Sequence, residues 1–210
     1  MNNITMSDFM SAALLAGGSS QRMGFDKQFF HIYKGRLFEH ILPKLSSLFE
    51  DVMIVTGQPE LYTNTNIRTV ADEIPGFGPL SGIHAAVKKS ISKYVYVLAC
   101  DMPVINGCYI DYMIDLLNKH AADACVTRKG SRIEPFHAFY GKKSLPVIEA
   151  DLLEGKASIL YLLEKINTYY IPESEAQRFT PDWSLFSNLN TPEDLFSWES
   201  KTKPPLQHRP

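Results

Sequence analysis

The stretch SAALLAGGSSQRMGFDK, residues 11–27, decides the fold of this chain. Residues 11–16 are too apolar to face water on either side, which predicts a central strand of a largely parallel sheet. Gly17 and Gly18 follow the strand and supply flexible backbone whose N–H groups can converge on phosphate oxygens. Arg22 and Lys27 lie just downstream and add positive charge suited to a triphosphate. The stretch therefore predicts a phosphate-binding loop after the first strand.

This loop differs from two common phosphate-binding motifs. No Gly-Lys-Ser/Thr closes it as in a Walker A loop, and its glycines lack the G-x-G-x-x-G spacing of dinucleotide-binding folds. By composition alone, an Ala-Gly-Gly turn after a strand is as often a plain turn as a binding loop. The fixed offsets of Arg22, Met23, Gly24, Asp26 and Lys27 favour the binding interpretation.

Short apolar runs alternate with longer amphipathic segments along most of the chain, which is typical of an α/β fold. We expect one domain over residues 10–199, with flexible termini at 1–9 and 200–210. Its sheet should be twisted, mostly parallel and flanked by helices, in a Rossmann-like arrangement. Further strands are predicted at 52–55, 67–70, 94–99, 122–127 and 135–140. Helices are predicted at 37–49, 81–90, 109–120, 144–153, 159–165 and 191–198.

The helix predicted at 37–49 carries one internal conflict. Its apolar residues fall at three- and four-residue intervals, so they share one face that should pack on the sheet. Pro43 lies within this pattern, where it removes a backbone donor and clashes with the preceding turn. We expect a kink or a break at this residue.

A carboxylate follows the strand predicted at 94–99. Asp101 stands in the sequence CDMP, at the carboxyl edge of a parallel sheet, where open α/β folds bind their ligands. Such a side chain is a natural magnesium ligand that shares the ion with nucleotide phosphates. An aspartate that merely caps the following turn is an equally simple interpretation of this residue taken alone.

The segment ADEIPGFGPLSGI lies between these two features. Asp72 ends a predicted strand, and the glycine-rich part opens a helix whose N-terminus favours an anion. A structural loop uses similar residues, but the position of this one between the other two motifs favours ligand binding.

Composition narrows the classes of partner. The net charge of -2 and the pI near 6.3 provide no broad basic field for nucleic acid or anionic lipid. Cys100, Cys108 and Cys125 form neither an even disulfide set nor a C-x-x-C pair. The N-terminal residues lack a signal-peptide pattern, and no apolar run approaches the length of a membrane span. These features predict a cytoplasmic protein that binds neither nucleic acid nor membrane.

Taken together, these segments resemble the molybdenum cofactor guanylyltransferases. The resemblance rests on the loop at residues 15–27, on GPLSGI at 78–83, on CDMP at 100–103 and on FSNLNTPEDL at 186–195. It extends from about residue 11 to 198. The C-terminal motif is similar to the family's N-x-N-T-P-E-D-L, which most other nucleotidyltransferases lack.

The resemblance implies a role for each matching residue. The nucleotide would be contacted by Leu15, Ala16, Gly17 and Gly18, and its phosphates by Lys27 and Arg22. Asp72 would lie near the guanosine. Asp101 would hold Mg²⁺ and support catalysis. Asn188 and Asn190 lie on the molybdopterin side, although Asn190 or Thr191 is also a good helix cap.

Two positions depart from the family. Val55 and Thr56 stand where a polar residue, commonly Asn, ends the second strand, and Ser81 replaces a common alanine, a change expected to matter little.

The implied reaction joins the terminal phosphate of molybdenum-molybdopterin to the α-phosphorus of GTP and releases pyrophosphate. The implied partners are GTP, molybdopterin and the acceptor molybdoenzymes or their chaperones.

Two alternatives remain open. One is a cytidylyltransferase for the same cofactor or another nucleotidyltransferase of the same fold, against which GPLSG and NLNTPEDL argue. The other is a noncatalytic carrier or regulator that binds GTP and molybdopterin, which the presence of Asp101 and Lys27 disfavours.

The six histidines show none of the spacings of zinc ligands, so we expect them on the surface or in the ordinary core. His137, in EPFHAFY, should face solvent from a strand. The aromatic residues Tyr169, Tyr170, Trp183 and Trp198 should close the C-terminal core.

Overall fold

The first strand lies in the middle of the sheet, where both of its neighbours run parallel to it. In the computed structural model, which describes residues 5–17, 31–32 and 35–202, β1 (Ser11–Leu15) pairs with β4 (Asp51–Val55) and with β6 (Tyr94–Ala99). All five residues of β1 are buried. A largely apolar strand requires such a position, and its one polar side chain, Ser11, donates a hydrogen bond to Asp51 instead of facing water.

Seven strands form this sheet, in the order β5-β4-β1-β6-β8-β7-β9. The remaining strands are β5 (Arg68–Val70), β8 (Arg132–Gly141), β7 (Ala124–Lys129) and β9 (Thr168–Ile171), of which β5 and β9 form the edges. β8 runs antiparallel to both β6 and β7, and the other pairs of this sheet are parallel. The expectation of a mostly parallel sheet is confirmed. The sequence pattern does not predict β9, whose two tyrosines it assigns to the C-terminal core.

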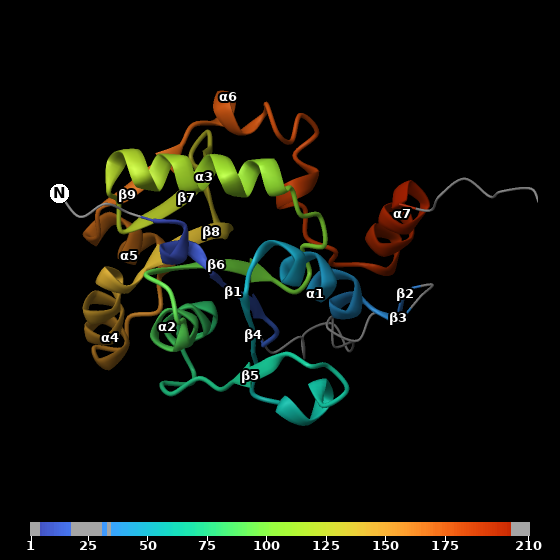
Figure 1. The fold of residues 1–210 in the computed structure, drawn as a ribbon, viewed down its shortest axis with the longest axis horizontal. Coiled ribbons are helices and arrows are strands. Elements are labelled where there is room, and N and C mark those ends of the chain that lie inside the picture. Colours follow the sequence, from blue (N-terminus) through green and yellow to red (C-terminus); the bar gives the residue numbers. More distant parts are fainter. Residues whose placement is uncertain (1–4, 18–30, 33–34, 203–210) are drawn as a thin grey trace, which may run out of the picture.

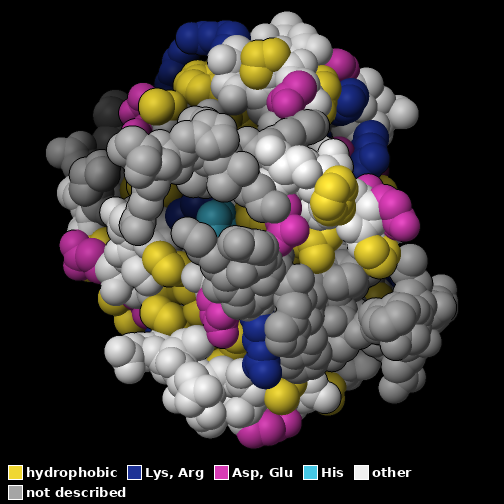
Figure 2. Space-filling model, turned by 90° about the vertical axis from the view of Figure 1, so that its right-hand side faces the viewer, with side chains coloured by type: hydrophobic (Ala, Val, Ile, Leu, Met, Phe, Trp, Pro, Cys, Tyr) yellow, Lys and Arg dark blue, Asp and Glu magenta, His cyan; other side chains and the backbone are white. Residues whose placement is uncertain are grey.

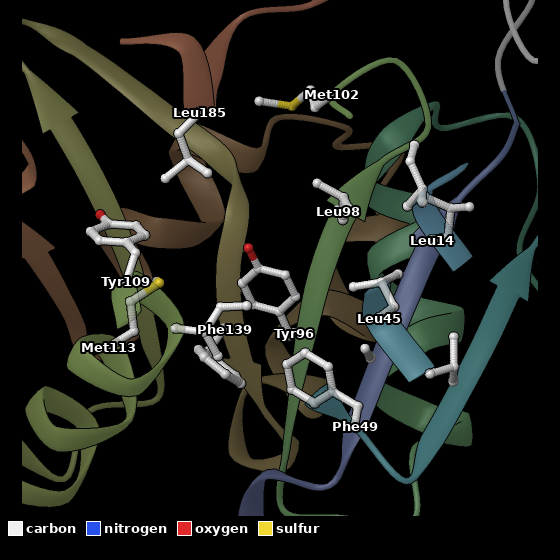
Figure 3. Packing of buried hydrophobic residues seen from close by; sticks show 14 of the residues in the cluster. Leu14, Leu45, Phe49, Tyr96, Leu98, Met102, Tyr109, Met113, Phe139 and Leu185 are labelled. Carbon is white, nitrogen blue, oxygen red and sulfur yellow. The ribbon is translucent and has the colours of Figure 1, made fainter. Parts of the chain in front are cut away.

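Helices cover both faces of the sheet (Figure 1). One face carries α1 (Leu37–Leu48) and α3 (Gly107–His120), and the other carries α2 (Pro79–Lys89), α4 (Leu145–Leu153) and α5 (Ile159–Lys165). Side chains of each strand alternate between the two cores, since successive residues of a strand point to opposite faces. Figure 3 shows the first core, where Phe49 and Phe139 flank Tyr96, whose hydroxyl points toward the end of β6 at which Met102 lies.

Shorter elements complete the structure: η1 (Met6–Phe9), β2 (His31–Ile32), β3 (Gly35–Arg36), η4 (Pro59–Tyr62), η5 (Lys142–Ser144), α6 (Glu173–Ala176), η6 (Ser184–Phe186) and α7 (Pro192–Thr202). β2 and β3 form a separate antiparallel pair. α7 contacts α1 through His40 and Trp198, whose ring centroids lie 5.0 Å apart. Among the helices of the described ranges, none combines the length and the hydropathy needed to cross a bilayer.

Helix α1 runs through Pro43 without a break. Leu37, Phe38, Ile41, Leu42 and Leu45 are buried as the pattern predicts. Packing of this apolar face against the sheet offsets the hydrogen bond that Pro43 removes, and the ring itself is exposed. The predicted break at this residue is therefore wrong.

The N-terminal turn also differs from the expected loose segment at residues 1–9. Phe9 is buried and stacks on Tyr94 with ring centroids 4.9 Å apart. At the other end, α7 extends to Thr202, beyond the residue at which a flexible tail was expected to begin. Apolar and aromatic contacts thus order more of the chain than its polar termini indicate.

His137 does not face solvent, which corrects the expectation for this residue. β8 bulges opposite β7, because Cys125 pairs with Phe139 whereas Thr127 pairs with Glu134. His137 lies within the bulge at φ 52°, is fully buried, and its Nδ1 lies 2.6 Å from the hydroxyl of Tyr96. A register shift of this kind turns a side chain that simple alternation assigns to the surface into the core.

Candidate active site

Four chain segments leave the sheet at one edge, the carboxyl edge of its parallel strands. The backbone ladder continues past the strand ends: Ala16 N donates to Val55 O (2.9 Å), Cys100 N to Leu15 O (3.1 Å), and Thr56 N to Val70 O (2.9 Å). The chain therefore carries Gly17 and Asp101 out of neighbouring strands, and Asp72 out of β5, two strands from β1, all at the same edge. This is the edge at which open α/β folds bind ligands.

The loop after β1 begins with Gly17. Leu15 and Ala16 are buried, whereas Gly17 is exposed, and no described atom lies within 4 Å of the place where a Cβ would stand on it. Packing within the described protein thus leaves room on this glycine, which suits a backbone that a ligand approaches closely. Three predicted residues of the same loop, Gly18, Arg22 and Lys27, lie outside the described residues.

Helix α2 packs directly beneath this loop. A Cβ on Gly82 would meet Leu15 Cδ2 at 3.3 Å, so the glycine of the GPLSGI motif allows α2 to approach the end of β1. Gly78 caps the helix at φ 60°, a conformation that favours glycine, and Pro79 opens its first turn.

Ser81 holds the preceding loop in place. Its hydroxyl donates to Ile74 O (2.7 Å) and accepts from Phe77 N (3.2 Å). Alanine offers neither bond, so the exchange of a common alanine for Ser81 changes how this loop is tied to α2. The expectation that this substitution matters little is not supported by these contacts.

Asp72 lies half-buried at the end of β5. Its Oδ1 atom is buried and accepts no hydrogen bond from the described residues. Burial raises the pKa of its carboxyl, and the nearby His84 acts in the opposite direction. A buried carboxylate oxygen without a donor is costly, which marks this atom as an acceptor suited to a ligand.

Asp101 and the C-terminal asparagines are brought together. Leu189 is buried, and its N–H donates to Asp101 O at 2.8 Å, while Asn188 and Asn190 on either side of it are exposed. The buried Met102 anchors the loop from below, with its N–H bonded to Ala99 O. Two motifs that stand far apart in the sequence therefore share one side of the sheet edge.

The start of α7 shows which residue caps that helix. Thr191 Oγ1 accepts from Asp194 N (3.1 Å), and Asp194 Oδ2 accepts from the N–H groups of Asn190 and Thr191 (2.9 Å each). Thr191 is therefore the capping residue of the two candidates.

At Val55 and Thr56, where the family commonly has a polar residue, the described structure presents no exposed polar side chain to a ligand. Val55 is buried in the core beneath α2, and the buried Thr56 hydroxyl accepts from Gln58 N (3.0 Å).

A cluster of protein ligands for a metal is not present in the part of the chain that the structure describes, where no group of three or more His, Cys, Asp or Glu side chains has the required arrangement. Asp101 is a half-buried carboxylate at this edge, as is Asp72. Such a site suits a cation that takes one or two carboxylates and completes its shell with phosphates and water.

Side chains of both charge signs are mixed on the face toward which α7 and the β2–β3 pair project (Figure 2). The described part of this face has no large patch of a single sign, in keeping with the composition.

The parallel sheet, the glycine turn after β1 and the carboxylates after β5 and β6 are typical of an α/β protein whose ligand site lies at the carboxyl edge. Comparison with known proteins makes the class specific. Residues 12–167 match the MobA-like NTP transferase domain. The chain therefore belongs to the MobA-like NTP transferase family and is a nucleotidyltransferase.

Individual relatives agree along nearly the whole chain. The molybdenum cofactor guanylyltransferase of Syntrophotalea carbinolica is 47% identical over 190 residues, which cover 90% of each chain. A protein of Peptoclostridium acidaminophilum named probable molybdenum cofactor guanylyltransferase is 44% identical over 200 residues, covering 93% of this chain and 90% of its own. The crystal structure of molybdopterin-guanine dinucleotide biosynthesis protein A from Archaeoglobus fulgidus superposes with a TM-score of 0.80 at 28% identity, covering 91% of this chain and 98% of that one.

Proposed function

We propose that this protein is a molybdenum cofactor guanylyltransferase, which transfers GMP from GTP to molybdenum-molybdopterin and forms the guanine dinucleotide cofactor. The observation that carries the proposal is the 47% identity to a guanylyltransferase over 90% of both chains. The arrangement of Asp72, Asp101 and Leu189 at one sheet edge supports it, because both substrates must meet at a single site.

The chemistry of the transfer is a displacement at phosphorus. An oxygen of the terminal phosphate of molybdopterin attacks the α-phosphorus of GTP, the bond from that phosphorus to the bridging oxygen breaks, and pyrophosphate leaves with the electron pair. A phosphate monoester has a second pKa of about 6, so the nucleophile is already an anion at neutral pH. The protein therefore needs to align the two phosphates and neutralise charge rather than remove a proton.

Asp72 is suited to the nucleoside. Its buried Oδ1 without a donor can accept an N–H of guanine or a ribose hydroxyl, and an unmade bond at this atom penalises a nucleotide that offers no donor there.

Asp101 is the residue that would hold Mg²⁺, with phosphates and water as the remaining ligands. When bound, the ion neutralises charge on the transferring group and on pyrophosphate. The hydrogen bond from Leu189 fixes the backbone of Asp101, so the carboxylate is presented from a constrained loop.

The remaining roles follow the family motif. Leu15, Ala16, Gly17 and Gly18 surround the nucleotide, while Lys27 and Arg22 add charge against its phosphates. Asn188 and Asn190, exposed beside the Asp101 loop, would bind molybdopterin. Acceptor molybdoenzymes or their chaperones would receive the product. Cys100, Cys108 and Cys125 form no disulfide with one another, which supports a place in the reducing cytoplasm.

Pyrophosphate release tests this function. The purified protein is supplied with Mg²⁺, molybdenum-molybdopterin and, in turn, GTP, CTP, ATP or UTP. Release with GTP alone is expected. Release with CTP would identify a cytidylyltransferase, and binding of GTP without release would identify a carrier.

A further inference from the structure

The hairpin between β7 and β8 ends in two cations at the carboxyl edge of the sheet. β8 runs antiparallel to both β6 and β7, so β7 ends at the same edge as β6. Lys129, the last residue of β7, pairs across the turn with Arg132, the first residue of β8. Side chains that pair directly across two strands share one face of the sheet, and like charges there repel each other. The hairpin therefore concentrates positive charge at one point of this edge.

The carboxylates around the hairpin leave one of the two cations without a counter-ion. Glu134 is buried, and its Oε1 lies 2.9 Å from Arg132 Nε. Glu173 on α6 accepts a hydrogen bond from Gly130 N (3.1 Å), which fixes the turn. Lys129 forms no ion pair and no side-chain hydrogen bond with any described residue. The three donors of its ammonium therefore have no acceptor in the described protein.

The ammonium of Lys129 lies over the ring of Trp183 instead, with Nζ 4.2 Å from the ring centroid. Such a contact holds a cation in place without neutralising its charge. Trp183 has a φ of 59°, a left-handed conformation that is uncommon for a bulky residue. Two backbone hydrogen bonds maintain it, from Trp183 N to Thr180 O and from Phe186 N to Trp183 O (3.0 Å each). Strained residues of this kind cluster at ligand sites, where the surrounding structure fixes them.

The segment that carries Trp183 continues into the C-terminal motif. The ring centroids of Trp183 and Phe186 lie 5.6 Å apart, and residues 187–190 follow directly, with Leu189 N bonded to Asp101 O. β7 lies on the side of β6 away from β1, two strand spacings or roughly 10 Å from β6. The two cations thus share the edge with Asp101 but lie on the side of the C-terminal segment, away from the loop after β1.

We propose that Lys129, with Arg132 beside it, binds the metal-bearing end of molybdenum-molybdopterin. The inference rests on the proposed function and names a group of its second substrate. The terminal phosphate of this substrate must meet GTP near β1 and β6, and the pterin ring carries no charge at neutral pH. The remaining anionic part is formed by the dithiolene sulfurs and the oxo-bearing molybdenum that they hold. A cation fixed in advance binds such an anion through charge-assisted hydrogen bonds.

Equilibrium binding of the molybdenum-loaded and the metal-free forms of molybdopterin tests this role, with calorimetry in the absence of nucleotide. Lys129→Met removes the charge and keeps an unbranched side chain that can lie over the tryptophan. We expect this variant to raise the Kd for molybdenum-molybdopterin about tenfold and the Kd for the metal-free form less than about threefold. The Kd for GTP should stay within about twofold of the wild-type value.

A control and a series of charges separate binding from folding. Lys143→Met carries the same substitution at an exposed residue of η5, at the opposite edge of the sheet, and should bind both forms as the wild type does. Lys129→Arg keeps the cation and should stay within about threefold of the wild-type Kd for molybdenum-molybdopterin, whereas Lys129→Glu should raise that Kd more than Lys129→Met does, by about fiftyfold. A purely structural lysine would not follow this order of charge.

Three results would overturn the proposal. An unchanged Kd for molybdenum-molybdopterin in Lys129→Met removes the lysine from the site. An equal rise for the metal-free form shows that the charge acts on the phosphate or the pterin and not on the metal-bearing end. A matching rise in the Kd for GTP shows that the substitution disturbs the whole site.

Failure of this inference is distinct from failure of the proposed function. If wild-type protein releases pyrophosphate with GTP while Lys129→Met binds both forms of molybdopterin normally, only the role of Lys129 is wrong. If wild-type protein releases no pyrophosphate from GTP with molybdenum-molybdopterin present, the proposed function is wrong and the role of Lys129 falls with it.

Discussion

The backbone N–H of Leu189 donates a hydrogen bond to the carbonyl oxygen of Asp101 at 2.8 Å. This bond joins the loop after β6 to the segment that carries Asn188 and Asn190. Leu189 is buried, so its side chain holds the segment in the core, while the asparagines on either side are exposed. The loop that carries the proposed metal-binding residue and the segment that carries the proposed molybdopterin-binding residues are thus joined by a backbone hydrogen bond.

Replacement of Asp101 tests the metal assignment. We expect Asp101→Ala to lower turnover at least about 100-fold, because the carboxylate is the proposed protein ligand of the divalent ion. The fold should be retained, since the hydrogen bond from Leu189 is made to the backbone of Asp101. Pyrophosphate release and circular dichroism measure the two effects. Asp111→Ala on the exposed side of α3 is the matched control, and full activity in Asp101→Ala would refute the assignment.

Lys27 provides a second test, at a residue outside the described ranges. The variant Lys27→Ala should lower kcat strongly, by about 100-fold, because the lysine ammonium would neutralise charge on the transferring phosphates. Lys119→Ala, at an exposed position near the end of α3, should retain wild-type turnover. Equal turnover of the two variants would remove Lys27 from the site.

His137 predicts a specific dependence of stability on pH. Burial lowers the pKa of its imidazole from 6.5 to about 3. The unfolded chain therefore binds the proton more readily, and the free energy of unfolding should fall as the pH drops below 6.5, by at most about 1.4 kcal/mol per pH unit.

The variant His137→Asn isolates this effect. Asparagine tolerates the positive φ and places an amide near Nδ1, where it can bind the Tyr96 hydroxyl. Urea unfolding at about pH 5, 6 and 7 should give a flatter profile for the variant than for the wild type. Parallel profiles would show that the histidine protonates without penalty in the folded protein.

Pro43 predicts a gain in stability. It lies inside α1 with its ring exposed, where it removes one backbone hydrogen bond and contributes little burial. Pro43→Ala should raise the free energy of unfolding by about 1–3 kcal/mol, measured by urea titration. A loss of stability would mean that the proline contributes a contact or a chain restriction that outweighs the missing bond.

The ion pair between Asp151 and Lys165 predicts an asymmetry. The side chain of Asp151 is 2% exposed, whereas that of Lys165 is 32% exposed. Lys165→Met leaves a buried carboxylate uncompensated and should cost about 3 kcal/mol. Asp151→Asn leaves a cation that water reaches, so its cost should be clearly smaller. Thermal unfolding of both variants decides the order, and equal costs would show that the pair acts through packing alone.

Much of the fold follows from local sequence pattern. The apolar runs that became β1, β4 and β6 predict their strands within a residue or two, because a strand covered on both faces leaves a continuous apolar signal. The apolar pattern does not predict β9, since Thr168–Ile171 is short and its tyrosines are only partly buried. β8 begins three residues earlier than its apolar pattern indicates, since charged Arg132 and Glu134 extend the antiparallel pairing with β7.

The candidate site, too, has one part that the sequence predicts and one part that it does not. The topology of a parallel sheet predicts that Gly17, Asp72 and Asp101 lie at one edge, and the described structure has them there. The contact between His84 and Glu149 joins α2 to α4, and the bond between Leu189 and Asp101 joins segments far apart in the chain. Neither contact can be predicted from hydrophobic periodicity or from a local motif, because both depend on how the helices and loops pack in the folded protein.

The late position of Leu189 in the chain has a consequence for biosynthesis on the ribosome. Strands β5, β4, β1 and β6 are all translated before the segment that clamps the Asp101 loop. A nascent chain can therefore assemble the centre of its sheet while the proposed metal-binding carboxylate, Asp101, still lacks its hydrogen bond from Leu189. If Asn188 and Asn190 bind molybdopterin as proposed, binding of that substrate begins only after residues 186–190 have been made, which separates in time the folding of the core from the onset of activity.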